Sequence, residues 1–169
     1  MADLIIPQKI IDDIIAYAKE LAPYECCGFL AGTETIVSKL YPIKNIVALE
    51  GAQKLASFDD EKVAHLERLS PEDRAEIAFV MDAQDISLAQ KDMRRHGLTL
   101  QVIYHSHPHD PARPSPTDIK IATDYEDHWE KINLPIPAHL LVSLMNPTPD
   151  VRCYWIKSGQ VSPTDFVIQ

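Results

Sequence analysis

The chain contains little cysteine, with three residues of this type in 169. Cys26 and Cys27 are adjacent and cannot easily pair with each other, and neither belongs to a Cys-x-x-Cys zinc pattern. On a strand they would point to opposite faces, and Cys153 is typical of a residue that fills a strand. These observations exclude a disulfide framework and fit a reducing cytoplasm. Cys26 directly follows Glu25, so a cysteine nucleophile remains an alternative, although no base is assigned to it.

Long apolar runs and clusters of basic residues are also missing. No window approaches a membrane-spanning length, and residues 1–4 lack the basic and apolar segments of a secretion signal. We therefore expect a cytoplasmic protein that does not contact a membrane. The formal net charge is −9, and no block of Lys and Arg is present, which argues against nucleic acid as the main partner. A cationic or mixed-charge protein surface is a better match for this acidic balance.

The most informative segment is residues 104–118, which read Tyr-His-Ser-His-Pro-His-Asp-Pro-Ala-Arg-Pro-Ser-Pro-Thr-Asp. Alternate residues of an extended chain point to the same side, so His105 and His107 can aim both imidazoles at one point while Ser106 turns away. Two imidazole nitrogens and the carboxylate of Asp118 suit Zn2+ and leave a fourth position for water, as in catalytic zinc sites. The segment therefore predicts a hydrolytic metal site.

The end of this segment has the signals of a helix start. Ser115 suits the N-cap, Pro116 the first helical position, and Asp118 the first turn. Asp118 could act as a cap only, or as both a cap and a metal ligand. The prolines within residues 108–116 make the loop stiff, which favours preorganised ligands. His109 shares the side of the other two histidines only if the strand continues past Pro108, so we expect it to be exposed to solvent.

The hydrophobic pattern predicts alternating helices and strands in one domain, residues 1–169, with no repeat and no linker. The expected fold is α/β, with a mixed, mainly antiparallel sheet flanked by helices. The predicted helices are residues 7–21, 86–95 and 116–129, with helical spacing also at 59–69 and a further helix start at 70–73. The predicted strands are residues 27–31 and 35–40, which form a hairpin around 32–34, and 41–48, 77–81, 98–104, 138–145, 151–156 and 161–168.

His-x-His, seven residues and Ser-x-x-Asp resemble the signature of the JAMM/MPN+ zinc metallopeptidases. Residues 23–28, Pro-Tyr-Glu-Cys-Cys-Gly, are similar to the family's upstream glutamate segment, and the likeness extends over residues 10–168. The resemblance implies a cytidine-deaminase-like fold with Zn2+ held by His105, His107 and Asp118. It also implies that Glu25 is the general base and that Ser115 donates to the oxyanion. The ligand segment itself offers only Asp110 as another spare carboxylate.

The resemblance also implies a substrate. Members of the family cleave peptide or isopeptide bonds after the C-terminal Gly-Gly of a ubiquitin-like or sulfur-carrier protein. An extended tail would add to a sheet edge, with the strands near Phe29 and Tyr104 as expected neighbours.

Two alternatives to this enzyme remain, a non-catalytic MPN scaffold and a relative associated with DNA repair. Residues around 49–76 depart from the smallest members of the family. They form either a surface insertion or a flap over the substrate groove.

Overall fold

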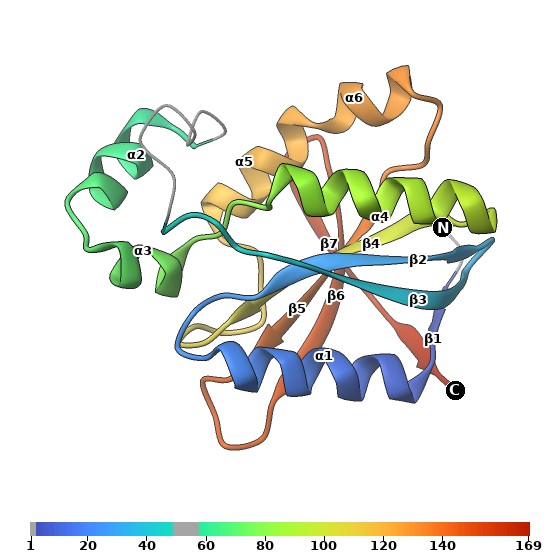
Figure 1. The fold of residues 1–169 in the computed structure, drawn as a ribbon, viewed down its shortest axis with the longest axis horizontal. Coiled ribbons are helices and arrows are strands. Elements are labelled where there is room, and N and C mark those ends of the chain that lie inside the picture. Colours follow the sequence, from blue (N-terminus) through green and yellow to red (C-terminus); the bar gives the residue numbers. More distant parts are fainter. Residues whose placement is uncertain (1–2, 49–57) are drawn as a thin grey trace.

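In the part of the chain that the computed structural model describes, residues 3–48 and 58–169, an eight-stranded sheet carries helices on both faces (Figure 1). The elements in chain order are β1 (Leu4–Ile6), α1 (Gln8–Leu21), β2 (Cys27–Thr33), β3 (Ile36–Ile43), α2 (Asp60–Glu67), α3 (Pro71–Ile77), α4 (Ala83–His96), β4 (Thr99–His107), α5 (Pro116–Asp124), α6 (Glu126–Lys131), β5 (Ala138–Ser143), β6 (Asp150–Lys157), β7 (Gln160–Thr164) and β8 (Phe166–Ile168). None of the helices in these residues combines the length and apolar character needed to cross a membrane.

The strand order is β7-β6-β5-β4-β2-β3-β1-β8. β4 lies near the middle, antiparallel to β2 and parallel to β5. Two further parallel pairs join β1 to β3 and to β8, and the remaining pairs are antiparallel. The mixed α/β fold predicted from the sequence is therefore confirmed. Only Asp165 separates β7 from β8, although they occupy opposite ends of the order, so the sheet curls until its two ends meet.

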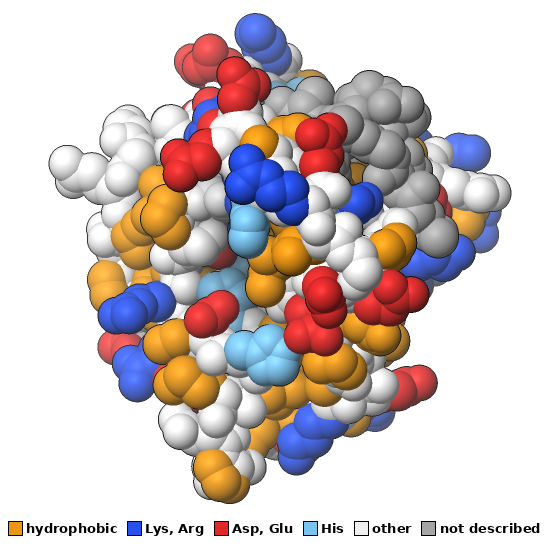
Figure 2. All heavy atoms as spheres, turned by 90° about the vertical axis from the view of Figure 1, so that its left-hand side faces the viewer, with side chains coloured by type: hydrophobic (Ala, Val, Ile, Leu, Met, Phe, Trp, Pro, Cys, Tyr) orange, Lys and Arg blue, Asp and Glu red, His pale blue; other side chains and the backbone are white. Residues whose placement is uncertain are grey.

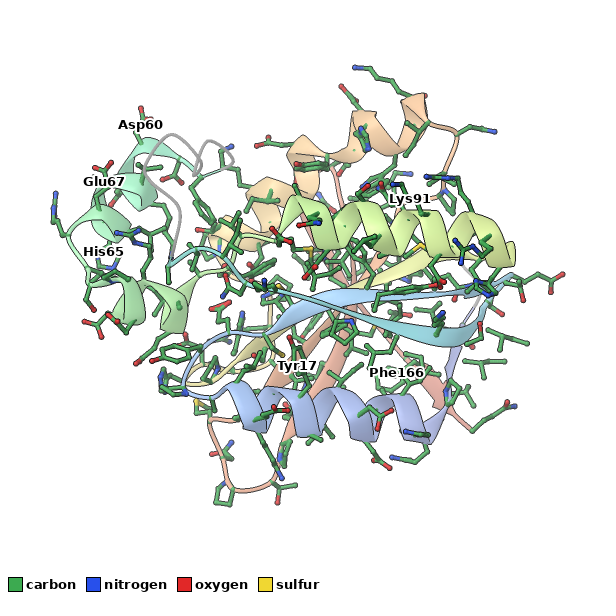
Figure 3. The ribbon with its side chains drawn as sticks, in the orientation of Figure 1. Tyr17, Asp60, His65, Glu67, Lys91 and Phe166 are labelled. Atoms are coloured by element: carbon green, nitrogen blue, oxygen red, sulfur yellow. The ribbon has the colours of Figure 1, made fainter. Side chains whose placement is uncertain are left out.

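The two faces of the sheet bury different cores because side chains alternate along each strand. α1 covers one face, where its apolar side chains pack with Val102 and Tyr104 of β4 and with Phe166 of β8 (Figure 3). α4 covers the other face, where Ala89 and Met93 pack near Ile103. Alternation from Ile103 onward therefore places both histidines of the motif on the α4 side.

α2 and α3 form a small unit at one end of the sheet (Figure 1). The start predicted at residues 70–73 is confirmed, since Ser70 caps α3 and accepts from the N–H of Asp73. Leu66 and Ala75 are buried in a separate apolar cluster that includes Val47. Asp60, His65 and Glu67 of α2 are exposed and point away from the sheet (Figure 3). Residues 49–57 of the predicted insertion lie outside the described residues.

Two predicted strands are wrong. β3 continues to Ile43 and replaces the start of the strand predicted at 41–48, while α3 occupies the start of the strand predicted at 77–81. Beyond these elements a single bridge joins Asn45 to Met81. The side chain of Asn45 bonds to nearby main-chain groups and replaces a regular strand ladder there.

The helix predicted at 116–129 divides at Tyr125 into α5 and α6. The Thr123 hydroxyl donates to the Ile119 carbonyl one turn earlier, a bond that often bends helices. The hairpin turn lies one to two residues later than predicted, with Glu34 in the left-handed region at φ 54°. The single strand predicted at 161–168 is divided into two strands, β7 and β8. Strand β1 was not predicted.

Candidate metal centre

Both histidines of the motif lie inside β4, which continues to His107 instead of ending at Tyr104 as predicted. Their side chains are almost fully buried, at 3% exposure for His105 and 7% for His107. Ser106 turns to the opposite face, as expected, and accepts a hydrogen bond of 2.8 Å from the Cys26 N–H. Pairing of His105 with both β2 and β5, and of His107 with β5, therefore fixes the direction of both imidazoles.

Three candidate ligand atoms converge at the end of β4. The Nε2 atoms of His105 and His107 are 3.0 Å apart. Asp118 Oδ2 lies 3.2 Å from Nε2 of His105 and 3.5 Å from Nε2 of His107. A tetrahedral zinc site with bonds of about 2.0–2.1 Å separates its ligand atoms by roughly 3.3 Å. The three separations are close to that triangle, so the spacing of these ligand atoms fits a metal ion of this size.

The tautomer of His107 agrees with this arrangement. Its Nδ1 lies 2.8 Å from the Pro111 carbonyl oxygen, which can only accept a hydrogen bond. Nδ1 is therefore the donor in this bond, and Nε2 is the ring nitrogen that faces His105 and Asp118. Metal-binding histidines usually donate their second ring N–H in this way, which fixes the ring and its tautomer.

Asp118 reaches the site through a capping box at the start of α5. Ser115 is the N-cap, and its Oγ accepts from the Asp118 N–H at 3.1 Å. In return Asp118 Oδ2 accepts from the Ser115 N–H at 2.8 Å. The same carboxylate oxygen also faces both histidines. The Asp118 carboxylate therefore caps the helix and also faces both imidazoles, while its role as a metal ligand stays a prediction.

Glu25 comes to the same point from the loop between α1 and β2. One carboxylate oxygen of Glu25 lies close to the two imidazoles. This oxygen, one ring nitrogen of His105 and one ring nitrogen of His107 all lie within 4.8 Å of one another. The side chain is only 6% exposed. Burial, followed by the negative charge of Asp118, raises the pKa of the Glu25 carboxyl well above its ordinary value. A carboxyl of this kind is suited to carry a proton near neutral pH.

The main chain around Glu25 is held from two sides. Its N–H donates to the Ala75 carbonyl at the end of α3 at 2.8 Å, and its carbonyl accepts from Asn45 Nδ2 at 3.0 Å. Asn45 also donates to Ala78 and accepts from Val47 and Val80. The loop thus has little freedom to move Glu25 away from the histidines.

The other candidate residues lie as follows. His109 is outside the cluster, 53% exposed, and pairs with Glu76 of α3 at 3.1 Å, so its predicted exposure is confirmed. Cys26 and Cys27 are both fully buried and lie in the cores of opposite faces, as the predicted alternation requires. Burial raises the pKa of the Cys26 thiol to about 11, which disfavours the cysteine-nucleophile alternative.

Several residues around the site carried no clear signal in the sequence. The Phe79 ring packs on the His105 imidazole with centroids 4.7 Å apart. Ser143 and Tyr154 bind the loop after His107. Their pattern in the sequence is that of ordinary strand residues, since only the folded sheet places them beside the loop. Figure 2 shows histidine and acidic side chains grouped near the middle of the face where β4 ends.

The fold and this cluster define a class, an α/β protein with a histidine and carboxylate metal centre at a strand end. A family model described as prokaryotic homologs of the JAB domain matches residues 7–157. The chain belongs to this family, which confirms the resemblance to the JAMM/MPN+ proteins.

Two curated relatives have descriptive names. A Thermus thermophilus protein called a probable TtuB-protein conjugate cleaving protease is 31% identical over 119 residues. The match covers 70% of this chain but only 63% of that protein, less than two thirds of its length. The CysO-cysteine peptidase of Mycobacterium tuberculosis is 28% identical over 170 residues, which covers 98% of this chain and 92% of the relative. Both names describe hydrolases and agree with the predicted class of reaction.

Solved structures agree with the fold. A Desulfitobacterium hafniense protein solved in solution has a TM-score of 0.69 and 27% identity, covering 98% of this chain and 92% of its own. A JAMM protein described as a metalloprotease-like zinc site in the proteasome and signalosome has a TM-score of 0.51 and 14% identity over 99% of both chains. At this identity the second likeness shows the shared fold alone.

Proposed function

We propose that this protein is a zinc-dependent peptidase that cleaves a peptide or isopeptide bond at the C-terminal Gly-Gly of a sulfur-carrier or ubiquitin-like protein. The observation that carries the proposal is the triangle formed by His105 Nε2, His107 Nε2 and Asp118 Oδ2, with sides of 3.0, 3.2 and 3.5 Å. Glu25 adds a buried carboxyl beside it. A cap or a salt bridge alone does not require three chain segments, the α1–β2 loop, β4 and the start of α5, to meet at one point.

Each residue of the centre has a proposed role. His105, His107 and Asp118 hold the metal. Zinc at this position would lower the pKa of a bound water toward about 7 and polarise the scissile carbonyl. Glu25 takes the proton of the attacking water and passes it to the leaving amine, a role that its raised pKa supports.

Ser115 is proposed to stabilise the negative charge that develops on the carbonyl oxygen. Its Oγ accepts from the Asp118 N–H, so its own O–H is still able to donate. One such donor contributes about 3 kcal/mol in comparable sites.

The names of the relatives support the substrate. One acts on TtuB-protein conjugates and another on CysO-cysteine, so a protein conjugated through its carrier tail is the substrate class that we propose here. An extended tail is the natural ligand, since it can bind by main-chain hydrogen bonds to a free sheet edge.

The main chain that would receive the tail differs from the prediction. β2 lies between β3 and β4, and β4 lies between β2 and β5, so the strands near Phe29 and Tyr104 offer no free edge. The extended residues 79–81 are a better candidate. Val80 uses its main-chain groups toward Ile46 and Asn45. Alternation then directs those of Phe79 and Met81 to the other side, and the Phe79 ring lies against His105.

We propose further that residues 49–76 form an insertion within the single domain and that its described part is a wall of the substrate groove. Two contacts favour a wall of the groove rather than a surface insertion far from the site. The Ala75 carbonyl accepts from the Glu25 N–H, and Glu76 pairs with His109 in the loop after the histidines. Residues 49–57 of the proposed insertion lie outside the described part of the chain.

Cleavage of defined fusions tests the proposal. Zinc-loaded protein is incubated with a sulfur-carrier protein ending in Gly-Gly-X, and the products are weighed by mass spectrometry. We expect release of X after the second glycine, and slow cleavage of a matched fusion whose glycines are alanine, because added methyl groups narrow the fit of an extended tail. Equal cleavage of both fusions, or of neither by fully loaded protein, would contradict the Gly-Gly specificity.

A further inference from the structure

Three consecutive main-chain carbonyls in the loop after His107 each accept a hydrogen bond from a different side chain. Ser143 Oγ donates to the Asp110 carbonyl at 2.5 Å. His107 Nδ1 donates to the Pro111 carbonyl at 2.8 Å, and the Tyr154 hydroxyl donates to the Ala112 carbonyl. The three donors belong to the adjacent strands β4, β5 and β6, so the sheet holds the loop from three neighbouring positions.

The donors on β5 and β6 are buried and fixed in place. Ser143 is 3% exposed and stands opposite His107 in the parallel pair of β4 and β5. Its Oγ also accepts from the Met145 N–H at 3.2 Å, which directs the hydroxyl proton toward Asp110. The Tyr154 ring packs with Ala112 and Leu141 in an apolar cluster, so its hydroxyl has little freedom to move.

We propose that Ser143 and Tyr154 are positioning residues for the metal centre, which they hold in shape through the Pro111 carbonyl. This inference rests on the proposed function, since it concerns His107 as a metal ligand. The carbonyls of the residues before and after Pro111 are both hydrogen-bonded to side chains of the sheet. The Arg113 N–H also donates to the Pro111 carbonyl at 2.8 Å, and the two flanking bonds hold the peptide groups on either side, so together they set its direction and that of His107 Nδ1–H.

A change in the hydrogen-bond partners of a ligand typically weakens metal binding by roughly 10- to 100-fold. Ser143 and Tyr154 act one step further out, through the peptide group, so we expect the lower end of that range, about 10-fold. A purely structural role predicts a different result. The loss of one buried hydroxyl would then lower stability but leave the His107 proton and the metal affinity unchanged.

The experiment uses the Tyr154→Phe and Ser143→Ala variants, with Ser143→Thr as the conservative variant that keeps a hydroxyl. Tyr41→Phe is the matched control, because Tyr41 is similarly buried at 8% exposure and its hydroxyl donates to Asp92 on the α4 side. Two readouts are measured, the affinity for Co2+ by competition with a chelator, and the exchange of the His107 Nδ1 proton by 15N NMR of the metal-free protein.

We expect Tyr154→Phe and Ser143→Ala each to weaken Co2+ binding about 10-fold and to speed exchange of the His107 proton by a similar factor. Ser143→Thr and Tyr41→Phe should retain the values of the unchanged protein. Unchanged affinity and exchange in both test variants, or an equal loss in Tyr41→Phe, would overturn the proposal. If the unchanged protein binds no Co2+ or zinc, the proposed function fails, and the exchange rates of the metal-free variants alone decide this inference.

Discussion

Asp118→Asn is the sharpest test of the metal centre because it separates the two roles of one carboxylate. Asparagine keeps a side-chain oxygen that can accept from the Ser115 N–H, so the capping box at the start of α5 can persist. It removes the negative oxygen that lies 3.2 Å from His105 Nε2 and 3.5 Å from His107 Nε2. Metal binding should therefore suffer far more than the fold.

The size of the effect follows from linkage between binding and folding. Zinc at 100 times its dissociation constant stabilises a protein that binds it only when folded by about 2.7 kcal/mol. For a chain of 169 residues this corresponds to a rise in Tm of roughly 5–11 °C. If loss of one ligand raises the dissociation constant about 100-fold, the same zinc concentration contributes only about 0.4 kcal/mol, or less than about 2 °C.

The assay is thermal unfolding by circular dichroism with EDTA and with added zinc. His109→Ala is the control, since this exposed histidine pairs with Glu76 outside the cluster and should keep the full zinc-dependent rise. The reasoning would be refuted by an equal rise in Asp118→Asn and the unchanged protein, or by loss of the rise in His109→Ala.

Two further predictions concern catalysis and pH. Glu25→Gln should keep zinc, measured by elemental analysis, but lose hydrolysis because the general base is gone. Ser115→Ala should also keep zinc and should lower kcat roughly 100-fold. Full activity in Glu25→Gln would show that Glu25 is not the base. Burial lowers the pKa of His139 to about 4, so the folded protein keeps it neutral while the unfolded chain takes up a proton as pH falls below about 6.5. Its contribution to stability is complete above pH 6.5 and is lost toward pH 4. Between pH 7 and pH 5, His139→Leu should therefore lose about 2 kcal/mol less than the unchanged protein in denaturant titrations, and equal losses would contradict this assignment.

The parts of the site that could be predicted depend on neighbours in the sequence. The period of a strand places His105 and His107 on one side, and the rules of helix starts place Asp118 in the first turn of α5. Glu25 lies eighty or more residues away in the chain and was found only by resemblance to a family. The contact of Glu25 with the histidines arises because Cys27 pairs with His105 across β2 and β4, a register that local patterns do not contain.

The errors in the fold have related causes. Residues 41–48 and 77–81 have apolar, β-rich sequences, but the Asn45 side chain replaces the ladder that two strands would have formed. The break at Tyr125 depends on a side-chain bond within the helix. Ser143 and Tyr154 could not be predicted because they act on a loop from different strands and have no fixed spacing from it.

The curl of the sheet has a consequence for how the chain is made. β1 at residues 4–6 pairs with β8 at residues 166–168. β6 pairs with β7, which directly precedes β8 in the chain. β7 and β8 follow the other described strands in the chain, so the open sides of β1 and β6 stay available to other chains until residues 160–168 have left the ribosome. Pairing across such a long stretch of sequence is also slow. A chain cut before residue 160 would lack both partners and would leave the outer sides of β1 and β6 open to a neighbouring chain.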